Sequence, residues 1–461
     1  MHLPLPVALI FGLDVRGIAP MILYVAGVVI FLVSAFWRPR YGVYFLLPLL
    51  PLQTLRYRLH DFWLGEKFVD IILLGIILGI LMKRDGDRFL KTPLNRFLIL
   101  FAVFLYVLLW KGSYYLGAPS PLDFAEDRVS TWKNYLEMPL LFLLVASVIK
   151  EVRHMKIVIL LMSTSFFLVA RSYFNTIRDR DLSTFSYAVR DAGPLGYAGE
   201  NGLAAFLVEF LIFLVAIYAF EKKVWRKLPL LGLIALGVYC MLFTFSRGGY
   251  LAFAVGLTFL GLLKDRKLLI VVLAVVIGWQ VLLPVSVQQR IMMTYDVEGG
   301  ALDTSAQTRV DLWEDAMQLI RVNPVVGIGL DTYRFLNRVG GYADTHNYYL
   351  KVMLETGAIG LMLFLWLLWR MLGLGWRLYR STEDPFLRSL GLGFTGMMVS
   401  AVVLNLFGDR WTYLQVNAFL WVLMGCVVRA QVIVSEAGQE APAVTAPAGA
   451  LPAPAGRPRL A

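Results

Sequence analysis

The sequence predicts an all-α polytopic membrane protein with about twelve transmembrane helices. Of its 461 residues, 59% are hydrophobic and only 16% are charged, and the mean hydropathy is +0.68. Such a composition leaves too little polar surface to cover soluble domains of this size. Apolar runs long enough to cross a hydrocarbon core of about 30 Å recur from Ile18 to Val434. One cleavable signal peptide cannot explain them.

Thirteen apolar segments are candidates for membrane spans. The second is short and contains Pro48 and Pro51, which interrupt a helix, so we expect either twelve or thirteen crossings. The segments lie at residues 18–36, 41–54, 68–82, 94–111, 132–149, 155–174, 201–220, 227–245, 249–263, 268–285, 346–369, 389–407 and 414–432.

The connections between these segments alternate in character. One set is short and basic, as at residues 83–91, 222–227 and 264–267, and the positive-inside rule places it in the cytoplasm. The longer connections then lie on the outer, periplasmic side, where we expect any chemistry; they are residues 112–131, 175–200 and 286–345. Because the net charge of +11 arises from basic residues scattered among the turns, topology explains it better than nucleic-acid binding does.

The large periplasmic loop, residues 286–345, is predicted to contain an amphipathic helix that can lie on the membrane surface. The helix is expected to end at Asn323-Pro324, before a tight turn at residues 327–329 that lacks the strand–turn–helix context of a nucleotide loop. Apolar residues recur along one helical face at Val310, Trp313, Met317 and Ile320.

The domain organisation is expected to be simple. Residues 1–435 form a transmembrane domain, and residues 436–461, rich in Ala, Pro and Gly, form a disordered cytoplasmic tail. Cys240 and Cys426 both lie in apolar segments, so neither a disulfide framework nor a zinc site is indicated. The chain has no Walker-type phosphate loop, and no convincing Asp-X-Asp element stands in the outer loops. These absences argue against ATP as the driver and fit a reaction that uses no metal and no other cofactor.

His346 is the candidate general base. The chain has four histidines, and this one opens a span at its outer mouth, where an imidazole can accept or donate a proton near neutral pH. The alternative is an interfacial histidine that is simply bonded to a backbone carbonyl, because membrane interfaces attract amphipathic side chains.

Three arginines on separate outer segments are candidates for anion binding. Arg247 precedes Gly248 and Gly249, which allow a ligand to approach the backbone at the start of a helix. An arginine so close to hydrocarbon normally has a partner, although Arg247 can also snorkel to lipid phosphate. Together with Arg190 and Arg309 it offers the planar, permanently charged donors that a diphosphate needs.

The motifs around these residues, from about 190 to 360, resemble the O-antigen ligase and polymerase superfamily. One departure is Tyr-Ala-Gly-Glu-Asn at 197–201, where relatives often show a Gly-Asn-Pro-Asn type of turn; this departure bears on Asn201. The motifs are Arg190 ahead of Gly-Tyr-Ala-Gly-Glu-Asn-Gly, Phe-Ser-Arg-Gly-Gly-Tyr at 245–250, Thr-Arg-Val-Asp-Leu-Trp at 308–313, Asn-Pro-Val-Val-Gly-Ile-Gly at 323–329, and Thr-His-Asn-Tyr-Tyr-Leu with Glu-Thr-Gly at 345–357.

The resemblance implies an O-antigen ligase of the bacterial inner membrane. Such an enzyme takes a glycan from undecaprenyl diphosphate and passes it, on the periplasmic face, to the lipid A–core of lipopolysaccharide, with inversion and without a metal. It implies that His346 accepts the proton of the acceptor hydroxyl and that Arg190, Arg247 and Arg309 bind the diphosphate. The residues expected to support the site are Asn347, Tyr348, Glu355, Gly248, Gly249 and Asn201.

Two kinds of alternative stay open. Within the superfamily, a polymerase passes the glycan to another lipid-linked repeat, and a protein ligase passes it to a protein hydroxyl. In a different class, a polysaccharide transporter or flippase would also have a dozen helices. Transporters usually carry ionisable residues near the bilayer midplane, whereas most spans here are clean, with Glu209 as an exception.

Overall fold

The computed structural model describes residues 15–86, 88–123, 126–293 and 304–440, and within them the regular structure is helical, with no strand. Six 3-10 helices, each of three to six residues, join some of the α-helices. The α-helices are α1 (Val15–Phe36), α2 (Arg40–Leu46), α3 (Gln53–Tyr57), α4 (Phe68–Leu81), α5 (Pro93–Leu116), α6 (Asp127–Val148), α7 (Val152–Ile177), α8 (Gly199–Phe220), α9 (Val224–Leu242), α10 (Arg247–Leu263), α11 (Lys267–Leu282), α12 (Val285–Met292), α13 (Thr304–Val322), α14 (Tyr348–Ser381), α15 (Pro385–Leu404) and α16 (Leu414–Glu440).

The chain is a multi-pass membrane protein. Among the described residues, the helices long and apolar enough to cross a membrane number eight, or nine if α11 and α12, which meet at a bend of 103°, form one broken span. The helices α4, with 14 residues, and α10, with 17, are shorter. Helix α6 also falls outside the set. The expected number of twelve crossings therefore stays a prediction. The eight are α1, α5, α7, α8, α9, α14, α15 and α16.

Residues 41–54, the second predicted span, do not form one continuous helix. Helix α2 has only seven residues, and the chain then turns through Pro48 and Pro51 before α3 begins. Proline has no backbone N–H and its ring clashes with the preceding helical turn, so a helix cannot run through both positions. The turn is buried by protein, with Leu46 and Leu50 at most 1% exposed, which is where irregular backbone is tolerated at membrane depth.

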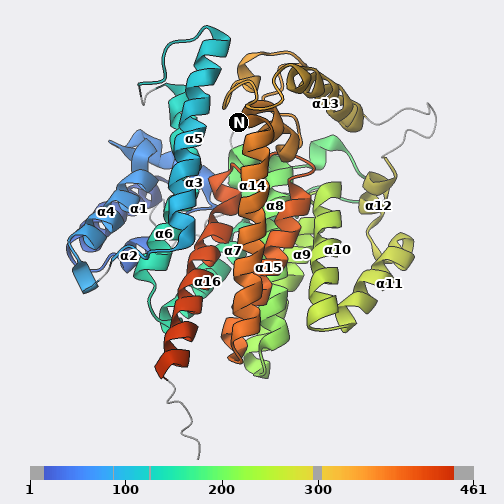
Figure 1. The fold of residues 1–461 in the computed structure, drawn as a ribbon. Coiled ribbons are helices and arrows are strands. Elements are labelled where there is room, and N and C mark those ends of the chain that lie inside the picture. Colours follow the sequence, from blue (N-terminus) through green and yellow to red (C-terminus); the bar gives the residue numbers. More distant parts are fainter. Residues whose placement is uncertain (1–14, 87, 124–125, 294–303, 441–461) are drawn as a thin grey trace, which may run out of the picture.

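Helices α8, α14, α15 and α16 form the centre of the bundle, while α1 and α4 lie at one edge and α11 at the other (Figure 1). Phe210 of α8 lies against Phe419 of α16, with ring centroids 5.3 Å apart. Gly393 and Gly396 of α15 face the side chains of α8, where an added Cβ would fall within 2.9 Å of a neighbouring atom. Small residues at such contacts let membrane helices approach closely.

Helix α13 confirms the helix that the sequence predicts in the large loop, and it ends at Val322, directly before Asn323-Pro324. It lies across the end of the bundle where α14 begins (Figure 1). Its buried face differs from the predicted stripe at all but Ile320, because α13 packs on α14 and on the loop after α13. Met317 is 43% exposed. The buried residues of α13 are Leu312, Ala316 and Ile320.

The turn at residues 327–329 is a packing element. Gly327 and Gly329 have φ values of 62° and 112°, which favour glycine, and an added Cβ would meet the backbone of α14 at Gly327 and of α5 at Gly329. At the other end of the chain, α16 continues to Glu440, so the predicted boundary of the tail at residue 436 falls inside a helix. The rest of the predicted tail, 441–461, lies outside the described residues.

Candidate active site

Two adjoining cavities lie at the end of the bundle that α13 covers. The first, the arginine lobe, has a volume of about 290 Å³ and the second, the histidine lobe, about 540 Å³. Arg247 and Arg290 line only the arginine lobe, and His346 lines only the histidine lobe. The lobes adjoin each other, since they share five lining residues: Arg190, Asn201, Arg309, Phe407 and Arg410.

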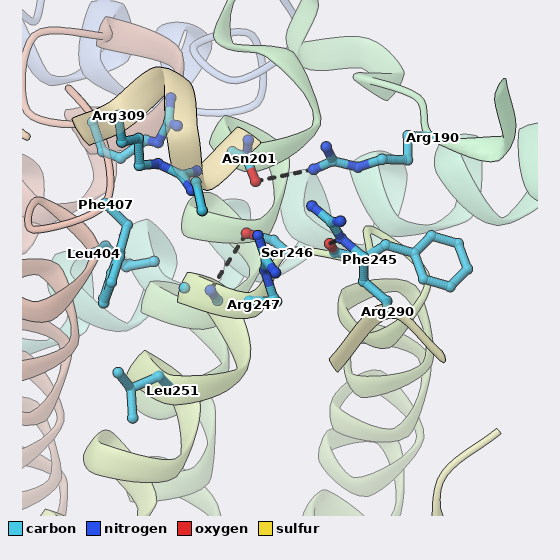
Figure 2. A pocket seen from close by; sticks show the side chains of 14 residues that line it. Arg190, Asn201, Phe245, Ser246, Arg247, Leu251, Arg290, Arg309, Leu404 and Phe407 are labelled. Atoms are coloured by element: carbon cyan, nitrogen blue, oxygen red, sulfur yellow. Dashed lines mark hydrogen bonds between the residues drawn. The ribbon is translucent and has the colours of Figure 1, made fainter. Parts of the chain in front are cut away.

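The structure brings the four residues singled out in the sequence, Arg190, Arg247, Arg309 and His346, to these two lobes, although they come from four separate segments. Figure 2 shows the arginine side chains around the arginine lobe, with Arg309 reaching it from α13 and Arg247 from the first residue of α10. The part each residue plays in the reaction stays a prediction.

The start of α10 is built to face an anion. The Ser246 hydroxyl caps the helix by accepting a hydrogen bond from the amide of Gly249 at 3.4 Å (Figure 2). Gly248 and Gly249 both line the arginine lobe, so the first turn exposes backbone to it without covering side chains. Both glycines are also tightly packed, because an added Cβ would lie 3.0 Å from Phe407 at Gly248 and 3.2 Å from Ala204 at Gly249.

Arg190 is held in place by three bonds. Its guanidinium pairs with Glu200 at 2.7 Å, donates to Asn201 Oδ1 at 3.0 Å and donates to the Thr244 carbonyl at 3.3 Å. Burial lowers the pKa of Arg190, and the charge of Glu200 opposes that shift. Although the motif at 197–201 departs from the turn that relatives often show, Asn201 orients Arg190 and lines both lobes.

His346 is backed by a carboxylate that the sequence interpretation missed. The Nδ1 atom of His346 lies 2.8 Å from Asp344 Oδ1, and the same oxygen accepts the His346 backbone N–H at 2.6 Å. Burial would raise the pKa of Asp344, but its hydrogen bond with His346 and the charge of that ring lower the pKa well below its usual range. Asp344 is therefore an anion at neutral pH. A proton on Nδ1 leaves Nε2 as the acceptor atom of a neutral imidazole.

Backbone geometry also orients His346. Its φ of 51° lies in the left-handed region, which is uncommon for a residue with a side chain. The next residue, Asn347, caps α14 by accepting a hydrogen bond from the Leu350 amide at 3.1 Å. The Tyr342 ring lies edge-on against the imidazole, with centroids 5.4 Å apart. These contacts fix the imidazole at the mouth of the histidine lobe.

Replacing Asp344 by Asn is expected to slow the glycan transfer that the resemblance implies by about 100-fold or more, because an amide no longer fixes the tautomer that leaves Nε2 free to accept a proton. Donor binding should be unchanged, since Asp344 lines neither lobe. Single-turnover rates and donor titrations measure the two effects. Asp311→Asn, at an exposed position of α13, is the matched control. A wild-type rate for Asp344→Asn would show that the pairing does not matter.

Two further arginines of the arginine lobe, Arg290 and Arg410, were also missed. Arg290 is 3% exposed; it donates to the Tyr187 hydroxyl at 3.2 Å and to the Phe245 carbonyl at 3.3 Å. The amphipathic stretch that forms α12 is the one sequence signal that could have drawn attention to it. Arg410 sits in a short turn between two spans and has no such signal.

The other supporting residues predicted around His346 do not line the lobes. Tyr348 is buried against Phe364, with ring centroids 5.1 Å apart. Glu355, 3% exposed, accepts the Asp331 backbone N–H at 3.0 Å and so fixes the loop after α13. Together with the cap Asn347, these residues shape the scaffold behind the site and do not face a ligand in it.

The lobes are strongly cationic. Five guanidinium groups line the arginine lobe, and among the described residues that line either lobe Glu200 is the one carboxylate. Within the described residues, no group of three or more His, Cys, Asp or Glu side chains is placed to hold a metal ion. This set of side chains suits a multiply charged anion held by charge-assisted hydrogen bonds.

A protein-family model described as O-antigen ligase matches residues 232–365. No curated protein matches the chain. The matched segment contains Arg247, Arg309 and His346, whereas Arg190 and Arg410 lie outside it.

Proposed function

We propose that this chain is a membrane glycosyltransferase of the O-antigen ligase superfamily, whose family model matches residues 232–365, and that it transfers a glycan from undecaprenyl diphosphate to the lipid A–core of lipopolysaccharide. The proposed site is the pair of lobes, on the periplasmic face of the inner membrane. The observation that carries the proposal is that a lobe with five arginines adjoins a lobe that presents a carboxylate-backed imidazole.

The arginine lobe suits the diphosphate of the donor. When the glycan leaves, the electron pair of the broken bond between the anomeric carbon and oxygen stays on the diphosphate, whose charge grows. Preorganised guanidinium groups stabilise that charge without rearranging in the reaction. They also repel divalent cations, which supports metal-independent transfer. Leu251, which is 48% exposed and lines the same lobe, offers apolar surface for the first part of the lipid chain.

The histidine lobe suits the sugar and the acceptor. The rings of Tyr187 and Tyr342, 53% and 43% exposed, offer faces on which a sugar can stack. The acceptor hydroxyl attacks the anomeric carbon from the side opposite the diphosphate, which inverts its configuration. Nε2 of His346 takes the hydroxyl proton, and Asp344 stabilises the imidazolium that forms.

Reconstitution tests the proposed reaction and its acceptor. The full chain in detergent would receive an undecaprenyl diphosphate-linked glycan with no ATP and no ion gradient, and three acceptors in parallel: lipid A–core, a second lipid-linked repeat, and a Ser- or Tyr-containing protein. We expect a product with the mass of glycan plus lipid A–core, together with released undecaprenyl diphosphate. A product with the second acceptor would identify a polymerase, and one with the third a protein ligase. Transfer to none of them, with glycan movement across vesicles, would identify a transporter.

A further inference from the structure

Resting on the proposed function, we infer that Arg410 binds the phosphate next to the transferred sugar and that the buried ion pair Lys351–Asp409 holds it there. Arg410 lies between α15 and α16, outside the segment that matches the family. It lines both the arginine lobe and the histidine lobe. A group at the junction of the two lobes is placed to contact the donor where the diphosphate meets the sugar.

The polarity of the arginine lobe gives the direction in which the donor lies. Leu251, 48% exposed, and Leu404 line this lobe and not the histidine lobe, so the lipid end of the donor belongs on their side. His346 is at the opposite side, where the acceptor attacks. The lipid-linked phosphate then lies beside Arg247, and the sugar-linked phosphate lies at the junction beside Arg410.

The turn that carries Arg410 is fixed by buried amide side chains. Asn405 Oδ1 accepts the Arg410 backbone N–H at 3.1 Å, and the Asn417 side-chain amide donates to the Arg410 carbonyl. Asn405 is 1% exposed and Asn417 is 0% exposed. Buried polar groups need hydrogen-bond partners. The two amide side chains find theirs in the backbone N–H and the backbone carbonyl of Arg410. The turn therefore holds its backbone rigidly while the guanidinium stays at the cavity.

The ion pair ties this turn to the helix that His346 precedes. Lys351 of α14 lies 2.9 Å from Asp409, with the two side chains 11% and 4% exposed, and the other Asp409 oxygen accepts the Thr412 amide at 3.2 Å. A backbone bond from Tyr348 to the Asn405 carbonyl, 2.9 Å long, joins the same two segments. A buried ion pair adds little stability because of its desolvation cost, so a role in fixing the geometry explains it better.

The guanidinium of Arg410 has charge to offer a ligand. Within the residues that the structure describes, it makes no ion pair with a carboxylate; its Nη1 donates to the neighbouring Asp409 carbonyl at 3.3 Å. By contrast, Arg190 at the same junction pairs with Glu200. Gly408 leaves room for this arrangement, because an added Cβ would fall 2.5 Å from Arg410 Nη2.

The test compares two lipids that differ by the sugar-side phosphate. Undecaprenyl diphosphate and undecaprenyl phosphate are titrated into the full chain in detergent, for wild type, Arg410→Ala, Arg410→Lys and Arg247→Ala. We expect Arg410→Ala to weaken diphosphate binding by about 10- to 100-fold and to leave monophosphate binding nearly unchanged. Arg247→Ala should weaken both. Arg410→Lys should recover part of the loss, since it keeps the charge without the planar fork.

The control is Arg388→Ala, at the opposite end of α15, where the side chain pairs with the exposed Glu383. It should bind both lipids as wild type does. Equal affinities of Arg410→Ala and wild type for the diphosphate, or an equal loss for the two lipids, would overturn the inference while leaving the proposed function standing. A wild-type protein that binds neither lipid would overturn the inference and the proposed function together.

The positioning role of the ion pair has its own readout. Replacing only Lys351 or only Asp409 would leave one buried charge without its partner and is expected to destabilise the fold. The variant is therefore the double substitution Lys351→Met with Asp409→Asn. It removes both charges and keeps an acceptor for the Thr412 amide. We expect this double variant to fold and to lose the preference for diphosphate over monophosphate, as Arg410→Ala does. A folded double variant with the wild-type preference would overturn the positioning role.

Discussion

His346→Ala is expected to slow glycan transfer by about 10²- to 10⁴-fold, the range that general acid–base catalysis contributes, while leaving the donor bound. The imidazole lines the histidine lobe and is 32% exposed, so its loss removes the proton acceptor without opening the core. The arginines of the other lobe are untouched. Single-turnover transfer to lipid A–core measures the rate, and titration with undecaprenyl diphosphate measures the binding.

Two further variants separate this chemistry from structure. His346→Gln keeps a hydrogen-bonding side chain but cannot carry the proton, so it should be as slow as the alanine variant. His60→Ala changes an exposed histidine that is remote from His346 in the sequence, and this variant should transfer at the wild-type rate. A His346→Ala variant that transfers at the wild-type rate would reduce His346 to the interfacial histidine of the simpler interpretation.

Arg247→Ala is expected to lower the rate of transfer strongly by weakening donor binding. A hydrogen bond to a charged group contributes about 1.5–3 kcal/mol, which corresponds to roughly 10- to 150-fold in affinity, and the same contact stabilises the leaving diphosphate. The side chain lies at the start of α10 and lines the arginine lobe, so the loss should appear first in the KM for the donor. Initial rates over a range of donor concentrations measure it.

The matched control is Arg226→Ala, at an exposed arginine on α9 that pairs with Glu221 at 3.6 Å outside both lobes. It should leave KM unchanged. If Arg247 instead snorkels to lipid phosphate, its alanine variant would keep the wild-type KM in detergent, and the phosphate role would be excluded.

The helical class of the fold follows from the sequence because the apolar runs are long and strongly hydrophobic, as in α8 and α16. The failures have local physical causes. Two prolines divide the segment at 41–54, and burial against other helices, not lipid, keeps it in the bundle. The helix α13 was predicted with its correct end, but its buried face depends on α14, which no periodicity within α13 reveals.

The site was predictable to the extent that its residues stand in motifs. Arg247 and His346 could be selected because each has an unusual place beside an apolar run. Asp344 and Arg410 stand in turns, and only the fold shows that Asp344 pairs with His346 and that Arg410 lines the lobes. Asn347 and Glu355 lie close to His346 in the sequence, but α14 directs them into capping and packing roles, since neighbours along a helix point in different directions.

The most direct test of the central claim is a cryo-electron microscopy structure of the His346→Ala variant, full length, with an undecaprenyl diphosphate-linked glycan bound. The account predicts the diphosphate in the arginine lobe, within hydrogen-bonding distance of Arg247 and Arg410, and the first sugar in the histidine lobe with its anomeric carbon facing the position of the missing imidazole. A diphosphate bound outside these two lobes, or a sugar directed away from residue 346, would contradict it.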